Sequence, residues 1–311
     1  MATETRTRFF RPIVLAAALA LSACASQAPQ RGTSASAATR TLSGNADELA
    51  GDALQELTES DAQTALAAIA RANLVAQNRP DLAWLHVRIC ALTPGCEPEP
   101  IEARFRKLAP DNGVVWLGPL ARAQSRRDKQ VEAQILEAMS RAQRFDVYWT
   151  TLIWRLSAAR RAKAPAAGAS PAPLTEALDR TTEVLSAAVV PAFKPLSTAC
   201  ELARTQDPTA RTRCDRIALA MQSSDTTLVE GLGIGMAQHL ATPASPEAIV
   251  LDERAATLSY RSQAAGAVVR SQVERDKFSA QLIELMKKLP REQDVSVAIL
   301  RWAGEPLLPG K

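Results

Sequence analysis

Three tryptophans at nearly constant spacing constrain the fold of this 311-residue chain more than any other feature. Trp84, Trp116 and Trp149 are separated by 32 and 33 residues. A period of this length, with helical sequence between the tryptophans, indicates pairs of helices that stack on one another. Alanine is abundant and aromatic residues make up only 4% of the chain, a composition that favours helix over strand. The sequence therefore predicts an all-α protein.

Residues 61–160 contain a tryptophan near the start of a first helix, alanines at close-packing positions and Pro110-Asp111-Asn112 at a repeat join. In these features the region resembles a tetratricopeptide array. The glycine and tyrosine of that family's first helix are not cleanly present, and the period is slightly short. The resemblance implies helix pairs in a right-handed superhelix with a concave face and no catalytic residues. We expect either a tetratricopeptide-like α-solenoid or an irregular helical array.

Residues 1–23 have the layout of a secretory signal peptide. Arg6, Arg8 and Arg11 form a basic region, and residues 13–21 form an apolar stretch that is too short to span a membrane. Residues 21–24, Leu-Ser-Ala-Cys, resemble the lipobox of bacterial lipoproteins, which implies cleavage before Cys24 and lipidation of it. An ordinary signal peptide with a chance cysteine is the alternative. By resemblance to enteric lipoproteins, the lack of aspartate after Cys24 implies the periplasmic face of the outer membrane.

Changes in composition divide the remaining chain. Residue Cys24 opens a polar, flexible tether that extends to residue 45. A first helical half follows at 46–160, then an Ala/Pro-rich linker at 161–173, and a second helical half at 174–303. Residues 304–311 form a loose tail. Within the two halves the sequence predicts, among others, helices over 98–108, 192–205, 246–262, 268–289 and 291–302. The helix over 268–289 has an apolar stripe that includes Val273 and Phe278. The linker is either a loop inside one array or a boundary between two domains, and we favour a long loop between two helical halves.

Four cysteines remain besides Cys24, which in an oxidising compartment indicates two disulfides. Cys90 lies in the last turn of an expected helix and Cys96 lies just past the Pro94-Gly95 break. Cys200 and Cys214 lie seven residues before and after Asp207, so an antiparallel helix hairpin would place them opposite each other. We expect the pairs Cys90–Cys96 and Cys200–Cys214.

Motifs for catalysis, metals or cofactors are weak in this chain. His86, Cys90 and Cys96 could hold zinc, but an exported protein favours the disulfide. The run Gly231-Leu-Gly233-Ile-Gly235 lacks the spacing of a phosphate loop, and we expect it to allow close packing of helices. The sequence predicts no cofactor, no metal site and no catalytic residue.

These features favour a membrane-anchored periplasmic scaffold that binds an envelope protein or peptide. The aromatic residues Trp116, Tyr148, Trp149 and Trp154 could line its binding face, although core packing is the usual role of such residues. The net charge of +4 falls to +2 without residues 1–23 and does not indicate nucleic acid. The alternative is an envelope enzyme, or an accessory to one, acting on cell-wall or lipid substrate. The sequence does not predict an oligomeric state.

Overall fold

The structure is a computed structural model that describes residues 44–59, 61–162, 172–201 and 206–310. The proposed signal peptide, Cys24 and most of the tether lie outside the described residues. Residues 42–311 belong to one compact unit. In the described residues the fold is all-α, as predicted, with no β-strand.

The described residues form fourteen α-helices and one short 3-10 helix. They are α1 (Ala46–Thr58), α2 (Ala62–Val75), α3 (Pro80–Leu92), α4 (Pro98–Leu108), the short 3-10 helix η1 (Gly113–Trp116), α5 (Leu117–Ser125), α6 (Lys129–Met139), α7 (Trp149–Ala162), α8 (Leu174–Ala188), α9 (Lys194–Ala199), α10 (Pro208–Met221), α11 (Thr227–Leu240), α12 (Pro246–Arg270), α13 (Arg275–Lys288) and α14 (Glu292–Ala303).

Local sequence signals explain where many of these helices begin and end. Asn45 caps α1 through a capping box with Glu48, and Asp61 caps α2 by accepting the backbone N–H of Thr64 at 3.0 Å. Pro80 occupies the first position of α3, where its missing N–H leaves no donor unsatisfied. Gly304 ends α14 with a φ of 70°, a conformation that glycine adopts without strain.

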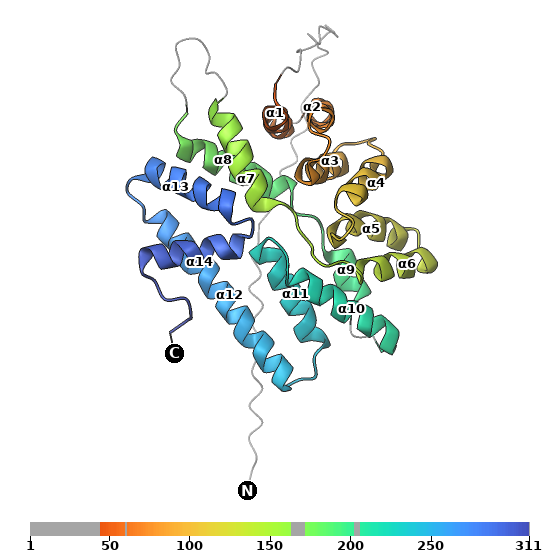
Figure 1. The fold of residues 1–311 in the computed structure, drawn as a ribbon. Coiled ribbons are helices and arrows are strands. Elements are labelled where there is room, and N and C mark those ends of the chain that lie inside the picture. The colour runs from red at the N-terminus through yellow and green to blue at the C-terminus, as the bar shows by residue number, and fades with distance from the viewer. Residues whose placement is uncertain (1–43, 60, 163–171, 202–205, 311) are drawn as a thin grey trace, which may run out of the picture. The chain divides into compact units, whose positions relative to one another are not determined.

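The contacts between neighbouring helices form a closed circuit that begins and ends at α1 (Figure 1). Successive contacts run from α1 through α4, then over α5 and α6 to α10, and on through α11, α12, α14 and α13 to α7 and α8, which contact α1. Asp47 on α1 supports this arrangement through ion pairs with Arg79 at 2.9 Å and with Arg155 of α7 at 3.4 Å. The helices α7 and α8 pack against each other although residues 163–171 separate them in the sequence.

A continuous apolar core connects the helices. Trp84 on α3 is buried and lies 5.6 Å, between ring centroids, from the buried ring of Phe105 on α4. Phe105 in turn meets Tyr148, just before α7, edge to face at 6.1 Å. The first tryptophan of the repeating set is therefore a core residue.

Two expected helices differ from the structure. We expected a helix over 192–205, but α9 is only Lys194–Ala199, with Cys200 as its C-cap. We also expected a break between residues 262 and 268, but α12 continues to Arg270. No proline interrupts this stretch, and its alanines favour helix, so the chain turns only at residues 271–274. Val273, expected on the apolar face of a helix, is 94% exposed in that turn.

The three glycines of α11 do not share one role. A Cβ atom at Gly233 would lie 2.7 Å from Cβ of Met221 and 2.9 Å from the Ala218 carbonyl, so this glycine allows α10 to approach closely. At Gly235 a Cβ would meet nothing within 4 Å, and at Gly231 only a leucine methyl at 3.8 Å. The expectation of close helix packing is therefore correct for Gly233 and wrong for its two neighbours.

Candidate functional site

The cysteines form the two predicted disulfides. Cys90 and Cys96 are joined with their Cα atoms 5.4 Å apart, and Cys200 and Cys214 with theirs 5.7 Å apart. The first bond ties the end of α3 to the turn that follows it. The second bond joins the residue after α9 to the middle of α10. The reason given for the second pair was partly wrong, because α9 is too short to form a symmetric hairpin with α10.

The Cys90–Cys96 disulfide uses both thiols that could have joined His86 in a zinc site. His86 is largely buried, and the positive charge of Arg104 acts on it. Burial and this charge lower the pKa of His86 to about 4, so its imidazole is neutral at neutral pH.

The two tryptophans Trp116 and Trp154 each stack with a cation. The guanidinium of Arg106 lies 4.9 Å from the ring centroid of Trp116. The guanidinium of Arg155 lies 4.5 Å from the centroid of Trp154, and the Lys287 ammonium of α13 lies 5.7 Å from it. Both rings are half-buried, and Trp116 packs against the core. Their role in binding stays a prediction.

Tyr148 and Trp149 lie at the start of α7 and take part in a polar network. Tyr148 has a φ of 58°, which is unusual for a residue with a side chain. The backbone N–H of Trp149 donates to the carboxylate of Asp225 at 3.0 Å. Of the four residues predicted to line a binding face, Tyr148 and Trp149 therefore lie together at the start of α7. Trp116 and Trp154 contact other neighbours.

Asp225 is the centre of this network, and sequence reasoning did not single it out. Its carboxylate accepts the backbone N–H of Val147 at 2.9 Å as well as that of Trp149, and its own N–H donates to Asp146 at 3.0 Å. Asn112 holds the same segment from the other side, because its side chain bonds the backbone N–H and C=O of Asp146. Two residues distant in sequence therefore fix the segment of residues 144–149.

The two neighbouring carboxylates shift each other's protonation. Burial and the charge of Asp146 raise the pKa of Asp225, while the N–H groups of Val147 and Trp149 oppose the rise. Burial also raises the pKa of Asp146, against the nearby Arg144 guanidinium. Their oxygens accept bonds from the backbone and from Arg144, so the pair also holds the segment of residues 144–149 in place.

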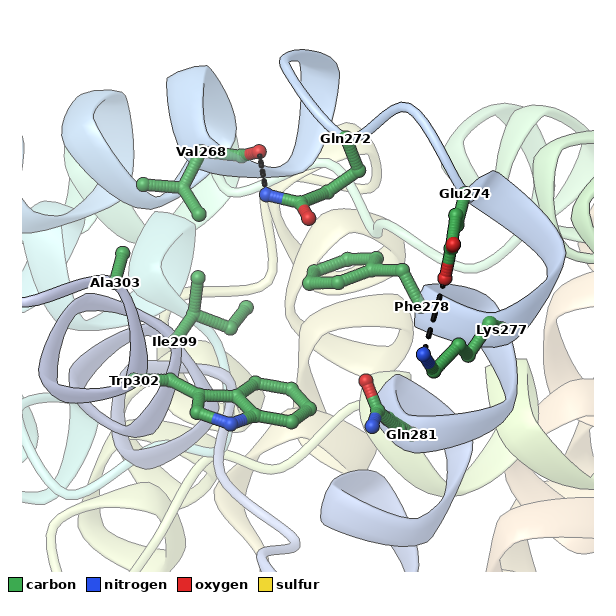
Figure 2. Close-up of a pocket in the computed structure, with 9 residues that line it drawn as sticks. All are labelled: Val268, Gln272, Glu274, Lys277, Phe278, Gln281, Ile299, Trp302 and Ala303. Atoms are coloured by element: carbon green, nitrogen blue, oxygen red, sulfur yellow. Dashed lines mark hydrogen bonds and ion pairs between the residues drawn. The ribbon is translucent and has the colours of Figure 1, made fainter.

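The C-terminal helices form a hollow of about 340 Å³ that sequence reasoning also missed. Figure 2 shows Phe278 of α13 and Trp302 of α14 pointing into the space between these helices, beside Val268 and Ile299. The two rings are stacked with centroids 6.0 Å apart and planes inclined by 30°. They form one aromatic wall of the hollow, which we call the α12–α14 hollow.

Polar side chains complete the lining of this hollow (Figure 2). Glu274 and Lys277 form an exposed ion pair at 3.0 Å, and the Gln272 side chain donates to the Val268 carbonyl at 2.9 Å. Trp302 is 51% exposed although it is a large aromatic residue. Apolar walls with a polar rim are typical of sites that receive an apolar side chain of a partner. The sequence signal was the apolar stripe of residues 268–289, but it did not identify Trp302 as the facing residue.

Comparisons of this chain with protein-family models, curated proteins and solved structures found no match. Among the described helices, none is long and apolar enough to cross a membrane. The geometry of the chain's own residues therefore carries the functional argument.

Proposed function

We propose that this protein is a lipid-anchored scaffold on the periplasmic face of the bacterial outer membrane, where it binds an envelope protein or peptide. The observation that carries the proposal is the α12–α14 hollow, in which Trp302 is exposed to solvent. Aromatic residues in such positions dominate the energy of many protein interfaces. The lipobox-like residues up to Cys24 and the two disulfides support an exported, anchored protein.

In this proposal an apolar or aromatic side chain of the partner enters the hollow and packs on Phe278 and Trp302. The amides of Gln272 and Gln281 and the Glu274–Lys277 pair form the polar rim around the contact. An interface of this kind combines a dry apolar centre with a solvated edge.

The test is cross-linking in living cells, followed by affinity purification of the tagged protein from the membrane fraction. We expect one dominant envelope partner with the wild-type chain and its loss with Trp302→Ala. Leu219→Ala is the matched control, because Leu219 is also a large exposed apolar residue, 65% exposed, but lies on α10. Recovery of the partner with Trp302→Ala, or equal loss with both variants, would contradict the proposed site.

Anchoring is tested separately through Cys24. We expect the wild-type protein to incorporate a labelled palmitate analogue and to sediment with outer membranes. Cys24→Ser is expected to lose the label and to enter the soluble periplasmic fraction. A Cys24→Ser variant that still carries the label would show that the lipobox interpretation is wrong.

An envelope enzyme or enzyme accessory acting on cell-wall or lipid substrate is the second candidate. The observation that favours it is the pair of carboxylates Asp146 and Asp225, whose pKa values are both raised. An Asp146→Asn variant that folds normally, binds the partner and loses a measured envelope activity would favour this second function.

A further inference from the structure

The largest of the described hollows lies away from the α12–α14 hollow and plays no part in the proposed scaffold function. Its volume is about 850 Å³ and it lies between the ends of α1, α2, α3 and α7 and one side of α8. This size is within the range of small-molecule sites in proteins, roughly 300–1,000 Å³. We call it the α1–α8 groove.

Apolar side chains form the walls of the groove. Leu57, Val184 and Ala188 belong to or pack against the core, whereas Leu92, 46% exposed, is open to solvent beside Ala187. A linear hydrocarbon chain would cover these exposed atoms, and each methylene buried there would increase the affinity.

Two arginines line the same groove, and of these only Arg180 forms an ion pair with another of the described residues. Arg160 in the last turn of α7 is half-buried, and among the described residues no carboxylate lies within ion-pair distance of it. Arg180 on α8 is close enough to act on it: burial and the Arg180 charge lower the pKa of Arg160, and the charges of Glu176 and Asp52 oppose this shift without reversing it. Arg180 itself is exposed and pairs with Glu176 at 3.3 Å.

A half-buried guanidinium beside a second one attracts an anion, because its fork of N–H donors matches carboxylate and phosphate oxygens. Glu59 and Glu183 also line the groove. The Glu59 carboxylate accepts the amide of Gln55 at 3.0 Å, and neither glutamate pairs with Arg160 or Arg180 in the described structure. An anion therefore has an open place at the arginines.

We propose that the α1–α8 groove binds an anionic amphiphile, with its apolar chain along Leu92 and Ala187 and its acidic head group at Arg160 and Arg180. The shared chemistry is one alkyl or acyl chain that ends in a phosphate or carboxylate. The ligand could come from the membrane, as an anionic phospholipid, or from solution, as a free acid. The inference does not depend on the scaffold function or on lipidation of Cys24.

The test is calorimetric titration of the full chain with dodecyl phosphate below its micelle concentration. We expect one site per chain. Dodecyl maltoside and dodecyltrimethylammonium have the same chain with neutral and positive head groups, and we expect both to bind more weakly by about tenfold or more, the effect of one charge-assisted hydrogen bond. Equal affinity for the three amphiphiles would overturn the proposal.

Matched variants locate the site. Arg160→Gln is expected to weaken the binding of dodecyl phosphate by about tenfold or more. Arg161→Gln, at the exposed next residue, is the control and should leave this affinity unchanged. Ala187→Trp is expected to fill the groove and abolish binding of all three amphiphiles, and Glu183→Gln is expected to preserve or strengthen binding. Circular dichroism of each variant checks its fold. Unchanged affinity in Arg160→Gln and Ala187→Trp would place the ligand elsewhere and overturn the assignment.

Two further ligands identify where the bound amphiphile comes from and test whether the groove binds an acidic peptide instead. Vesicles of anionic phospholipid that bind through Arg160 would identify a membrane lipid, while binding of monomers alone would identify a free amphiphile, and both results support the site. Hexaglutamate carries the charge without the chain. If it bound as tightly as dodecyl phosphate, the groove would be a site for acidic peptides and the proposal would be wrong.

Discussion

At the scale of single residues, the function of a side chain in this protein depends on neighbours that are distant in sequence. Gly233 and Gly235 lie two positions apart on α11, yet only Gly233 faces the backbone of α10. His86 is near the thiols of Cys90 and Cys96 in sequence, but burial and Arg104 determine its protonation. The two glycines and His86 each support a direct prediction.

We predict opposite effects of alanine at the two glycines. Gly233→Ala is expected to destabilise the fold by about 1–3 kcal/mol, because its Cβ would overlap Met221 and the backbone of Ala218. Gly235→Ala is expected to stabilise it by up to about 1 kcal/mol, because alanine favours helix and the site is open. Urea unfolding measures both values. A larger loss in Gly235→Ala than in Gly233→Ala would contradict the packing described for α11.

His86 is predicted to make the protein less stable in acid. The unfolded chain protonates this histidine near pH 6.5, whereas the folded chain keeps it neutral down to about pH 4. Between these values the unfolded state binds more protons, so the free energy of unfolding falls as the pH falls, by up to about 3 kcal/mol. At higher pH the histidine is neutral in both states and contributes no slope.

The measurement compares the free energy of unfolding of the wild type and of His86→Gln from pH 4 to pH 7. The difference between the two is expected to change across this window, since the variant cannot titrate at this position. Parallel curves for His86→Gln would show that this histidine does not titrate differently on folding.

At the scale of elements, local signals predicted helix starts well and long-range contacts poorly. Prolines mark the first residues of α4 and α12, and both helices begin where the sequence indicated. The end of α12 was predicted wrongly, because no local stop signal precedes its actual end. The hydrogen bond from the Trp149 N–H at the start of α7 to Asp225 could not be predicted, because these groups are 76 residues apart in the chain.

The candidate site was only partly predictable for the same reason. The apolar stripe that contains Phe278 was recognised, but a stripe does not reveal which helix will face it. Trp302 was assigned to a terminal helix without a partner, and only the packing of α14 on α12 and α13 brings it to Phe278. The disulfides were predictable because each pair is close in sequence, with separations of 6 and 14 residues.

The two disulfides are predicted to differ in their contribution to stability. In the chain-entropy account the bond that closes the longer loop contributes more, about 3 kcal/mol for Cys200–Cys214 against about 2 kcal/mol for Cys90–Cys96. Double alanine variants of each pair, compared by urea unfolding, measure these values. A clearly greater loss from the Cys90–Cys96 pair would show that local packing outweighs loop closure.

At the scale of the whole molecule, the return of the helix contacts to α1 separates this protein from an open repeat array. In an open solenoid each repeat contacts only its neighbours, so end repeats can unfold alone. Here α1 contacts both α2 and the α7–α8 pair, so the first helix of the unit is not a free end.

We therefore predict that residues 42–311 unfold in one cooperative step. Far-ultraviolet circular dichroism reports all helices, and tryptophan fluorescence reports Trp84, Trp116, Trp149, Trp154 and Trp302, which are distributed over the unit. The two signals are expected to give coincident urea transitions. Separate midpoints for the two signals would indicate that part of the array unfolds independently.

The packing of α7 on α8 has a further consequence for chain continuity. These helices are bound to each other and to α1 across the stretch 163–171, so the peptide bonds of that stretch are not what holds the two halves together. A gene divided there would encode two fragments that recognise each other through their own apolar surfaces. The protein would then serve as a split reporter, whose reassembly signals that two fused partners have met.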